Sequence, residues 1–198
     1  MAIVSIIIPC RNEECFIGKC LESIASQDYT KEDMEVLVVD GMSEDGTRGI
    51  ITEYAEKYNF IKLLDNPKKI ASSAFNIGIK NSKGEFIIIM SAHSTYSSDY
   101  VTKCVRSVAE HTVDIVGGCC STMPGADTPV ARSIALALSS KFGVGNSYFR
   151  VGGVQKPRLV DTVPFGCYKR EVFDRIGLFD EELIRNQDDE LNLRALSK

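Results

Sequence analysis

The sequence lacks several features that would assign it to a well-marked class of protein. No apolar run approaches the roughly 20 residues that a membrane-spanning helix needs. The amino-terminal stretch has no basic region of the kind that begins a secretory signal peptide, and charged residues start at Arg11. We therefore expect a cytoplasmic location, with contact to the inner face of the membrane only through segments beyond residue 198.

Metal-binding and disulfide patterns are also absent. The seven cysteines are an odd number without a C-x-x-C pair, and the chain has only two histidines. Zinc sites and disulfide frameworks need such spacings or an even count, so we expect buried, reduced thiols. The net charge of −4 leaves no basic excess to neutralise phosphates, which argues against a nucleic-acid partner.

The usual phosphate-binding loops are missing as well. The sequence contains no G-x-x-x-x-G-K-[ST], and no G-x-G-x-x-G follows the first apolar run. The stretch GVGNSY at 143–148 has no strand-like run before it. These absences argue against a P-loop NTPase and against a classical dehydrogenase.

The sequence does contain a regular alternation of strand-like and helix-like segments. Continuous apolar runs typical of strands buried on both faces alternate with segments of helical spacing. We predict strands at 3–9, 34–40, 59–66, 84–90 and 113–120, and helices from 13 after an Asn12 cap, at 47–58, at 71–81, and at 97–111 with Ser97 or Ser98 as cap. This order predicts an α/β fold with a doubly wound, mostly parallel sheet.

The pattern changes after Cys120. A helix is expected at 128–142, followed by a long glycine-rich loop or hairpin with short strand-like pieces up to Tyr168. The last helix begins near residue 186 with three successive acids, which the helix dipole favours. We expect one domain over 1–198, and the missing carboxyl-terminal cap suggests that a longer protein continues beyond it.

Polar clusters follow four of the predicted strands, at 9–13, 40–45, 66–69 and 91–94. The carboxyl ends of parallel strands share one sheet edge, where such folds bind ligands. Asp40 follows a rigid strand and suits a ribose hydroxyl or a base N–H, whereas Asp45 fits ordinary Asp-Gly turn chemistry equally well. His93 stands in the fourth cluster with no carboxylate beside it in the sequence.

Four motifs together resemble family 2 glycosyltransferases of the GT-A fold, a Rossmann-like nucleotide-diphospho-sugar transferase fold. They are VSIIIPCRNEE, VLVVDGMSEDGT, FNIGIKNSKGEFIIIM and IGLFDEELIRNQDDELNLR. FGVGNSYFR, VDTVPFGCYKREVFDRIG and NQDDELNLR resemble the succinoglycan-type glucosyltransferase branch. The resemblance implies a nucleotide-sugar-binding half at 1–120 and an acceptor-side half at 121–198.

The resemblance also implies a donor site. It would bind a nucleotide sugar, with UDP-glucose as the default, and Asp40 would contact the uracil or ribose. The residues that match the family's donor-binding positions are Pro9, Arg11, Glu13, Asp40, Ser43, Asp45, Asn76, Ser91 and Ala92.

The family normally ends the strand before residue 91 in Asp-x-Asp, which holds a divalent metal, but this chain reads Ser91-Ala92-His93. In one interpretation His93 and the donor diphosphate hold Mn²⁺ or Mg²⁺, although Mg²⁺ prefers oxygen ligands. In another, metal is dispensable and the cations Arg150, Lys156 and Arg158 neutralise the leaving group. In a third, His93 only bonds its neighbours.

On the acceptor side, Asp188 matches the family's catalytic base, with Gln187 in place of the usual Glu before it. Phe165 and Gly166 would lie near the acceptor. A base there would deprotonate an acceptor hydroxyl while nucleoside diphosphate leaves from the opposite face, inverting the anomeric centre. Alternatively, the acids only favour a helix N-terminus.

The resulting expectation is an inverting hexosyltransferase of exopolysaccharide biosynthesis with a saccharide or lipid-linked acceptor. The alternative is a nucleotide-sugar-binding module that has lost catalysis, because the first metal-binding Asp is replaced by Ser91. A nucleotidyltransferase is more remote, because the carboxylates and the basic pyrophosphate loop that it needs are not evident.

Overall fold

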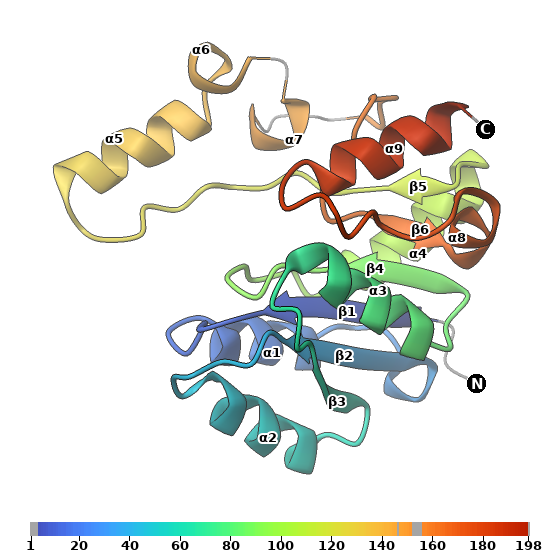
Figure 1. Ribbon diagram of the computed structural model, residues 1–198. Coiled ribbons are helices and arrows are strands. Elements are labelled where there is room, and N and C mark those ends of the chain that lie inside the picture. The colour runs from blue at the N-terminus through green and yellow to red at the C-terminus, as the bar shows by residue number, and fades with distance from the viewer. Residues whose placement is uncertain (1–3, 146, 152–155, 198) are drawn as a thin grey trace. The chain divides into compact units, whose positions relative to one another are not determined.

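The computed structural model describes residues 4–145, 147–151 and 156–197. Figure 1 shows helices packed on both faces of a central sheet. The elements in chain order are β1 (Val4–Cys10), α1 (Ile17–Ala25), the 3₁₀ turn η1 (Lys31–Asp33), β2 (Met34–Asp40), α2 (Thr47–Lys57), β3 (Ile61–Asp65), α3 (Ala71–Asn81), β4 (Phe86–Ile89), α4 (Tyr100–His111), β5 (Ile115–Val116), α5 (Pro129–Leu138), α6 (Lys141–Val144), α7 (Tyr148–Val151), β6 (Cys167–Lys169), α8 (Arg170–Ile176) and α9 (Gln187–Ser197).

The sheet has six strands in the order β3-β2-β1-β4-β6-β5. β1 pairs in parallel with β2 and β4, and β2 pairs in parallel with β3, whereas β6 runs antiparallel to both of its neighbours. The predicted α/β fold with a mostly parallel sheet is thus confirmed. The sequence did not indicate that a late, short strand would be inserted between the fourth and fifth.

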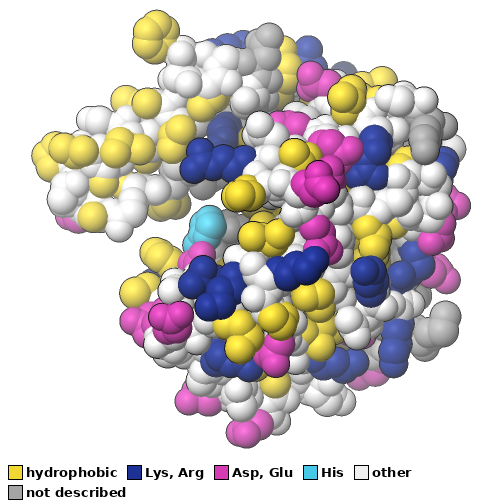
Figure 2. Space-filling model, viewed as in Figure 1, with side chains coloured by type: hydrophobic (Ala, Val, Ile, Leu, Met, Phe, Trp, Pro, Cys, Tyr) yellow, Lys and Arg dark blue, Asp and Glu magenta, His cyan; other side chains and the backbone are white. Residues whose placement is uncertain are grey.

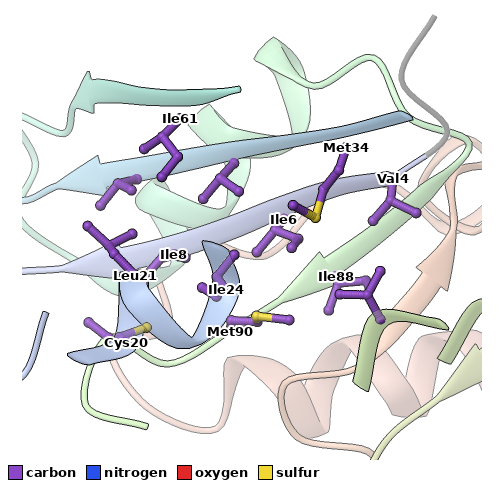
Figure 3. Close-up of a cluster of buried hydrophobic side chains, with 14 of the residues drawn as sticks. Val4, Ile6, Ile8, Cys20, Leu21, Ile24, Met34, Ile61, Ile88 and Met90 are labelled. Atoms are coloured by element: carbon purple, nitrogen blue, oxygen red, sulfur yellow. The ribbon is translucent and has the colours of Figure 1, made fainter. Parts of the chain in front are cut away.

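Two apolar layers hold the helices to the sheet. On one face, β1 contributes Ile6 and Ile8, which pack with the buried side of α1 and with residues of α2 and α4 (Figure 3). On the other face, Ile7 of the same strand packs with residues of α3, α8 and α9. Each fully buried aliphatic side chain contributes about 1.5–3 kcal/mol, so these layers account for the rigidity of the strands.

The chain divides into two compact units. One contains the residues up to Val116 together with those from Asp161 onward, and the other is Gly117–Val160. We expected one half to end at residue 120, which is close to the limit of the first unit at Val116. The late segment that contains β6, α8 and α9 belongs to the same unit as the amino-terminal part. The sheet and the residues of the acceptor side therefore share one unit.

Several local predictions were wrong for identifiable reasons. Asn12 does not cap a helix, because it takes a left-handed φ of 54° and its side chain accepts a hydrogen bond from the Glu44 N–H. The helix consequently begins only at Ile17. The residue preceding α4 is Asp99 rather than a serine, and β5 spans two residues instead of eight.

The glycine-rich stretch and the cysteines also differ from expectation. The described residues of 143–168 contain the end of α6, the short helix α7 and the start of β6, but no further strand. All seven cysteines are free, as predicted, yet Cys15, Cys119 and Cys120 are exposed rather than buried. No helix in the described part of the chain is long and apolar enough to cross a membrane.

Candidate active site

The carboxyl ends of β1 to β4 meet at one edge of the sheet, which we call the carboxyl edge. The chain runs outward from β1 to β2 and β3, and then α3 returns it to β4 on the other side of β1. The point between β1 and β4 is therefore where the winding direction reverses, and open α/β sheets bind ligands at such points. The loops that follow β1 and β4 carry Glu13 and His93 to this position.

The loops after β1 and β2 are joined by hydrogen bonds into one wall. The Asn12 N–H donates to Ser43 Oγ at 2.8 Å, and the Glu13 N–H donates to Thr47 Oγ1 at 2.7 Å. Asp45 accepts from the Thr47 N–H at 3.0 Å, which is the turn role that its Asp-Gly sequence suggested. Ser43 and Asp45 thus fix the wall, and their contact with a donor stays a prediction.

Basic side chains lie along this wall. Arg11, the residue after β1, packs so close to Gly41 that a Cβ there would lie 3.3 Å from the arginine side chain. Its Nη2 is 4.0 Å from Glu44 Oε1, and Lys69 Nζ is 3.9 Å from the same oxygen. Both cations are partly exposed and weakly paired, so they remain available to an anionic group.

Asp40 is held inside the protein. Its side chain is 0% exposed, and it accepts hydrogen bonds from the Ser43 N–H at 2.9 Å, from the Ser43 hydroxyl and from Arg48 Nη1 at 2.6 Å. Burial would raise the pKa of Asp40, but the bonds from Ser43 and the charge of Arg48 outweigh it and lower the pKa. A direct bond to uracil or ribose, as the resemblance implies, would require this arrangement to change.

The question of a partner for His93 has a structural answer. His93 Nδ1 lies 3.1 Å from Glu13 Oε1, so a carboxylate stands beside it after all, supplied by the loop that follows β1. The ring is largely exposed, whereas Glu13 is mostly covered. A neutral imidazole that donates from Nδ1 keeps its Nε2 lone pair for another partner. Glu13 therefore orients His93 at the point where the winding reverses.

The neighbouring positions offer oxygen atoms without partners. Ser91 Oγ is buried with no hydrogen-bond partner, and so is Asn66 Oδ1 at the end of β3. Ala92 is buried against the apolar layer of α1 and α4. Because buried polar atoms normally find partners, these two oxygens at one sheet edge can each accept a further hydrogen bond.

These residues do not by themselves fit a divalent metal. The described residues contain no group of three His, Cys, Asp or Glu side chains that could hold a cation. The positions that match the family's metal motif supply one imidazole nitrogen and one hydroxyl, whereas Mg²⁺ requires mainly charged oxygen ligands. A cation here would depend on oxygen atoms that a ligand brings with it.

The acceptor-side residues reach the same sheet edge through β6. The Ile89 N–H, in the last residue of β4, donates to the Gly166 carbonyl at 3.0 Å. Phe165 takes a left-handed φ of 50° and is partly exposed. A Cβ on Gly166 would lie 3.1 Å from the Tyr168 ring, so glycine permits this close packing. Phe165 and Gly166 thus lie one strand away from the segment that leads into His93.

The three acids that begin α9 have different surroundings. Asp189 accepts a hydrogen bond from Thr162 Oγ1 at 2.8 Å, and Glu190 forms an ion pair with Arg194. The carboxylate of Asp188 has no hydrogen-bond or ion-pair partner among the described residues. It lies close enough to the buried Tyr168 that its charge, after burial itself, raises the pKa of that phenol. Asp188 is therefore the acid that is free to act on a ligand.

The segment that leads into α9 is bonded to the carboxyl edge. Lys68 Nζ lies 2.7 Å from Glu181 Oε2, and Ser72 Oγ donates to the Leu183 carbonyl at 3.4 Å. Gln187, the first residue of α9, has a buried Oε1 without a partner. These contacts anchor the approach to Asp188 beside the loop that follows β3.

Asn76 is hydrogen-bonded within the protein, and its contact with a donor stays a prediction. Its Oδ1 accepts from the Phe179 N–H at 3.0 Å, and its Nδ2 donates to the Phe179 carbonyl and to Glu181, each at 2.9 Å. Both ends of the amide are thus used inside the protein. Pro9 lies within β1 and contributes to this region only through its position in the strand.

Sequence reasoning missed one pairing and two residues of the site. It did not pair Glu13 with His93, did not identify Arg48 as the partner of Asp40, and did not include Asn66 among the donor residues. The first pairing could have been found, since the two residues follow the strands on either side of the reversal point. Nothing in the sequence indicated that Arg48 would pair with Asp40, except its place in the first turn of the helix that follows β2.

Comparison with known proteins identifies the family of the chain. The family described as Glycosyl transferase family 2 matches residues 5–177. A Methanococcus voltae protein named dolichyl N-acetyl-alpha-D-glucosaminyl phosphate 3-beta-D-2,3-diacetamido-2,3-dideoxy-beta-D-glucuronosyltransferase is 34% identical over all of this chain and 63% of its own length. The succinoglycan biosynthesis protein ExoA of Rhizobium meliloti (strain 1021) is 32% identical over 96% of this chain and 56% of its own. The chain thus spans less than two thirds of these relatives.

Solved structures show the same fold. Staphylococcus aureus TarS in complex with UDP superposes with a TM-score of 0.73 at 23% identity, covering 98% of this chain and 55% of that one. A mannosyltransferase from Pyrobaculum calidifontis in complex with GDP-Man and Mn²⁺ gives a TM-score of 0.69 at 24% identity, covering 94% and 49%. On the match over residues 5–177 and on this architecture, the chain belongs to glycosyl transferase family 2 and has the GT-A fold.

Proposed function

We propose that this chain is the catalytic domain of an inverting glycosyltransferase of polysaccharide biosynthesis. It transfers a hexose, with UDP-glucose as the default donor, to a saccharide or lipid-linked saccharide. Family membership supports the reaction class. The observation that carries the proposal is the unpartnered carboxylate of Asp188, whereas the next two acids, Asp189 and Glu190, are bonded within the protein.

Asp188 acts as the general base in this proposal. A carboxylate at the acceptor side removes the proton of the attacking hydroxyl as that oxygen bonds to the anomeric carbon. The bond from the anomeric carbon to the diphosphate oxygen breaks on the opposite face, so the configuration inverts. Phe165 and Gly166 border the acceptor, and the buried oxygen of Gln187 supplies one more hydrogen-bond acceptor next to the base.

The carboxyl edge binds the donor. The wall that Ser43 and Asp45 fix receives the nucleoside, and the weakly paired Arg11 and Lys69 provide positive charge for the diphosphate. Stabilising the departing diphosphate in a water-poor cleft contributes strongly to such reactions. His93, oriented by Glu13, would offer its Nε2 lone pair to a cation held by the diphosphate.

A divalent cation would enter together with the donor. The fit of Ser91 and His93 to a metal is poor on its own, so calorimetry should detect no Mn²⁺ binding to the free protein. If Mn²⁺ binds with UDP but not alone, the diphosphate supplies the missing ligands. UDP affinity that is unchanged by Mn²⁺ would favour charge neutralisation by basic side chains of the protein instead.

The test of the proposal compares two neighbouring acids. Asp188→Asn should lower kcat for sugar transfer about 10²–10⁴-fold, the usual contribution of a general base, with UDP affinity unchanged. Asp189→Asn, which removes the charge but keeps an oxygen that can accept from Thr162, should lower kcat by no more than a few-fold. Equal losses in the two variants would contradict the assignment of Asp188.

A nucleotide-sugar-binding module without catalysis is the alternative. The substitution of Ser91 at the family's metal position favours it, because a strong ligand is lost there. Such a module would bind UDP normally but show neither transfer nor donor hydrolysis with any cation. Turnover by the wild type that disappears in Asp188→Asn would exclude this alternative.

A further inference from the structure

The unit formed by residues 117–160 exposes an unusual amount of apolar surface. α5 begins at Pro129 and is capped by Thr128 Oγ1, which accepts from the Ala131 N–H at 3.2 Å. Val130, Ile134 and Leu136 in this helix are 69%, 55% and 73% exposed. Figure 2 shows hydrophobic side chains gathered over α5. Val130 and Ile134, four residues apart, share one face of the helix, whereas Leu136 lies on another. Exposed apolar patches such as that of Val130 and Ile134 mark interaction surfaces in soluble domains.

The apolar surface continues past the end of α5. Phe142, in the following helix α6, is fully exposed. The corner between the two helices is tight, since a Cβ on Gly143 would lie 2.1 Å from the Ala137 carbonyl oxygen. The two helices thus present their apolar side chains in one fixed arrangement.

The charge of this unit is opposite to that of the rest of the chain. It contains five basic residues and only one acid, Asp127, a net charge of +4, whereas the whole chain has −4. The remaining residues therefore have a net charge of −8. Asp127 is paired with Arg132, so the other four cations determine the charge of the surface.

We propose that residues 117–160 dock on an anionic lipid surface through α5 and α6. Exposed apolar side chains on helices, in a unit with an excess of basic residues, are the combination that binds an anionic bilayer interface. The two helices are too short to cross a bilayer, which fits a helix that lies on it. Each basic residue near an anionic leaflet adds to the attraction, and salt weakens it.

The same observations disfavour two other occupants. A nucleic acid would match the charge but not the exposed Val, Ile, Leu and Phe side chains. A second copy docked through the same surface would bring two units of net charge +4 together. The proposal goes beyond the proposed glycosyl transfer and stands or fails independently of it.

Vesicle co-sedimentation tests the apolar part. The chain should pellet with vesicles of phosphatidylglycerol and phosphatidylcholine, and at least tenfold less with phosphatidylcholine alone or in high salt. Ile134→Asp should reduce binding to the mixed vesicles at least tenfold. The control Leu196→Asp, at a 66%-exposed position of α9, should leave it unchanged.

A fluorescence measurement keeps the test independent of folding defects. The chain has no tryptophan, so Phe142→Trp places a single conservative probe on α6, and Phe16→Trp, at an exposed position outside the unit, is its control. Emission of the first should shift to the blue when mixed vesicles are added, and emission of the second should not.

Three outcomes would overturn the proposal. They are no binding to mixed vesicles, equal shifts from both probes, and a stable dimer in solution that Ile134→Asp dissociates. In the last case a second copy covers α5. None of these outcomes bears on whether Asp188→Asn loses sugar transfer.

Discussion

The two edges of the same sheet use their polar residues in opposite ways. At the amino edge, the buried Glu35 accepts hydrogen bonds from Ser5 Oγ at 2.7 Å and from the Lys83 N–H at 2.6 Å. Ser5 Oγ in turn accepts from the Gly84 N–H at 2.8 Å, and Arg170 Nε donates to the Gly84 carbonyl at 2.7 Å. Each of these groups is satisfied within the protein.

At the carboxyl edge, polar atoms are left without partners. The described residues contain three buried side-chain atoms with no hydrogen-bond partner, and they are Asn66 Oδ1, Ser91 Oγ and Gln187 Oε1. The first two end strands at this edge, and the third begins the helix of the proposed base. The polar groups of the amino edge are therefore hydrogen-bonded within the protein, whereas some buried polar atoms of the carboxyl edge are not.

Backbone conformation follows the same division. Six non-glycine residues in the described part have a left-handed φ, and five of them lie in the loops of the carboxyl edge or of the acceptor side: Asn12, Met42, Lys69, Phe165 and Asn186. Conformations of this kind cost energy and persist where the surroundings impose them, often at functional sites. The unpartnered atoms and the backbone conformations thus distinguish the carboxyl edge from the amino edge without reference to any family.

The largest expected effect on stability is at the amino edge. Glu35→Ala leaves the Lys83 N–H and the Ser5 hydroxyl without their acceptor, which should lower the free energy of unfolding by about 3 kcal/mol. Urea denaturation measures the loss. UDP affinity of the folded fraction should not change, and Glu44→Ala, an exposed acid at the carboxyl edge, should cost less than about 0.5 kcal/mol. A stability loss in Glu44→Ala as large as that in Glu35→Ala would contradict the proposed difference between the two edges of the sheet.

One substitution made at both edges sharpens the comparison. Ser5→Ala removes a hydroxyl with partners and should destabilise by about 1–2 kcal/mol. Ser91→Ala removes a buried hydroxyl without partners and should be neutral or slightly stabilising, while donor affinity falls several-fold. Denaturation and UDP calorimetry on both variants provide the check. If Ser91→Ala destabilises as much as Ser5→Ala, its hydroxyl has a structural partner and not a ligand.

Sequence patterns predicted the fold well where burial alone determines structure. The apolar runs at 34–40 and 84–90 are strands because both of their faces are covered, and a continuous β-branched run shows this directly. β6 was missed because its three residues form a strand only by pairing with β4 and β5. No local propensity encodes such long-range pairing.

The candidate site was predictable in position but not in its contacts. Strand ends located the clusters, because parallel strands bring their carboxyl ends together. The sequence could not show that Asp40 is enclosed by Ser43 and Arg48, or that Asn76 bonds to the segment at 179–181. Those contacts depend on side-chain directions that only the packed loops determine. The resemblance singled out Asp188 among the three acids of α9, but the sequence could not show that its neighbours Asp189 and Glu190 are bonded within the protein.

The pair of Glu13 and His93 allows a smaller, spectroscopic test. In the neutral ring, Nδ1 should be the protonated nitrogen of His93, since it faces Glu13 Oε1. Nitrogen chemical shifts report the tautomer, and His111, exposed at the end of α4, is an internal control in a chain with two histidines. Glu13→Gln should shift the tautomer of His93 alone. Identical tautomers for the two rings in the wild type would mean that Glu13 does not orient His93.

Asp40 is an exception to the contrast between the two edges of the sheet. It lies at the carboxyl edge, but its carboxylate is hydrogen-bonded within the protein. Its pKa is lowered from the usual 3.8, so at low pH the unfolded chain binds a proton more readily than the folded one. The stability contribution of this carboxylate is present above the unfolded value and is lost as pH falls through the folded one. Asp40→Asn should flatten the decline of unfolding free energy between about pH 5 and pH 3, by at most about 1.4 kcal/mol per pH unit.

Two substitutions compared with each other test whether the buried Asp40 affects donor binding directly or through the loop that contains Ser43. If Asp40 acts by fixing the loop that contains Ser43, then Arg48→Met should weaken UDP binding as much as Asp40→Asn, because both break the same ion pair. Calorimetry on the two variants, with Ser43→Ala as a third, measures this. A loss of UDP binding confined to Asp40→Asn would mean that the carboxylate leaves Arg48 to bond the nucleotide. In that case the closed arrangement around Asp40 is the resting form of a residue that opens when the donor binds.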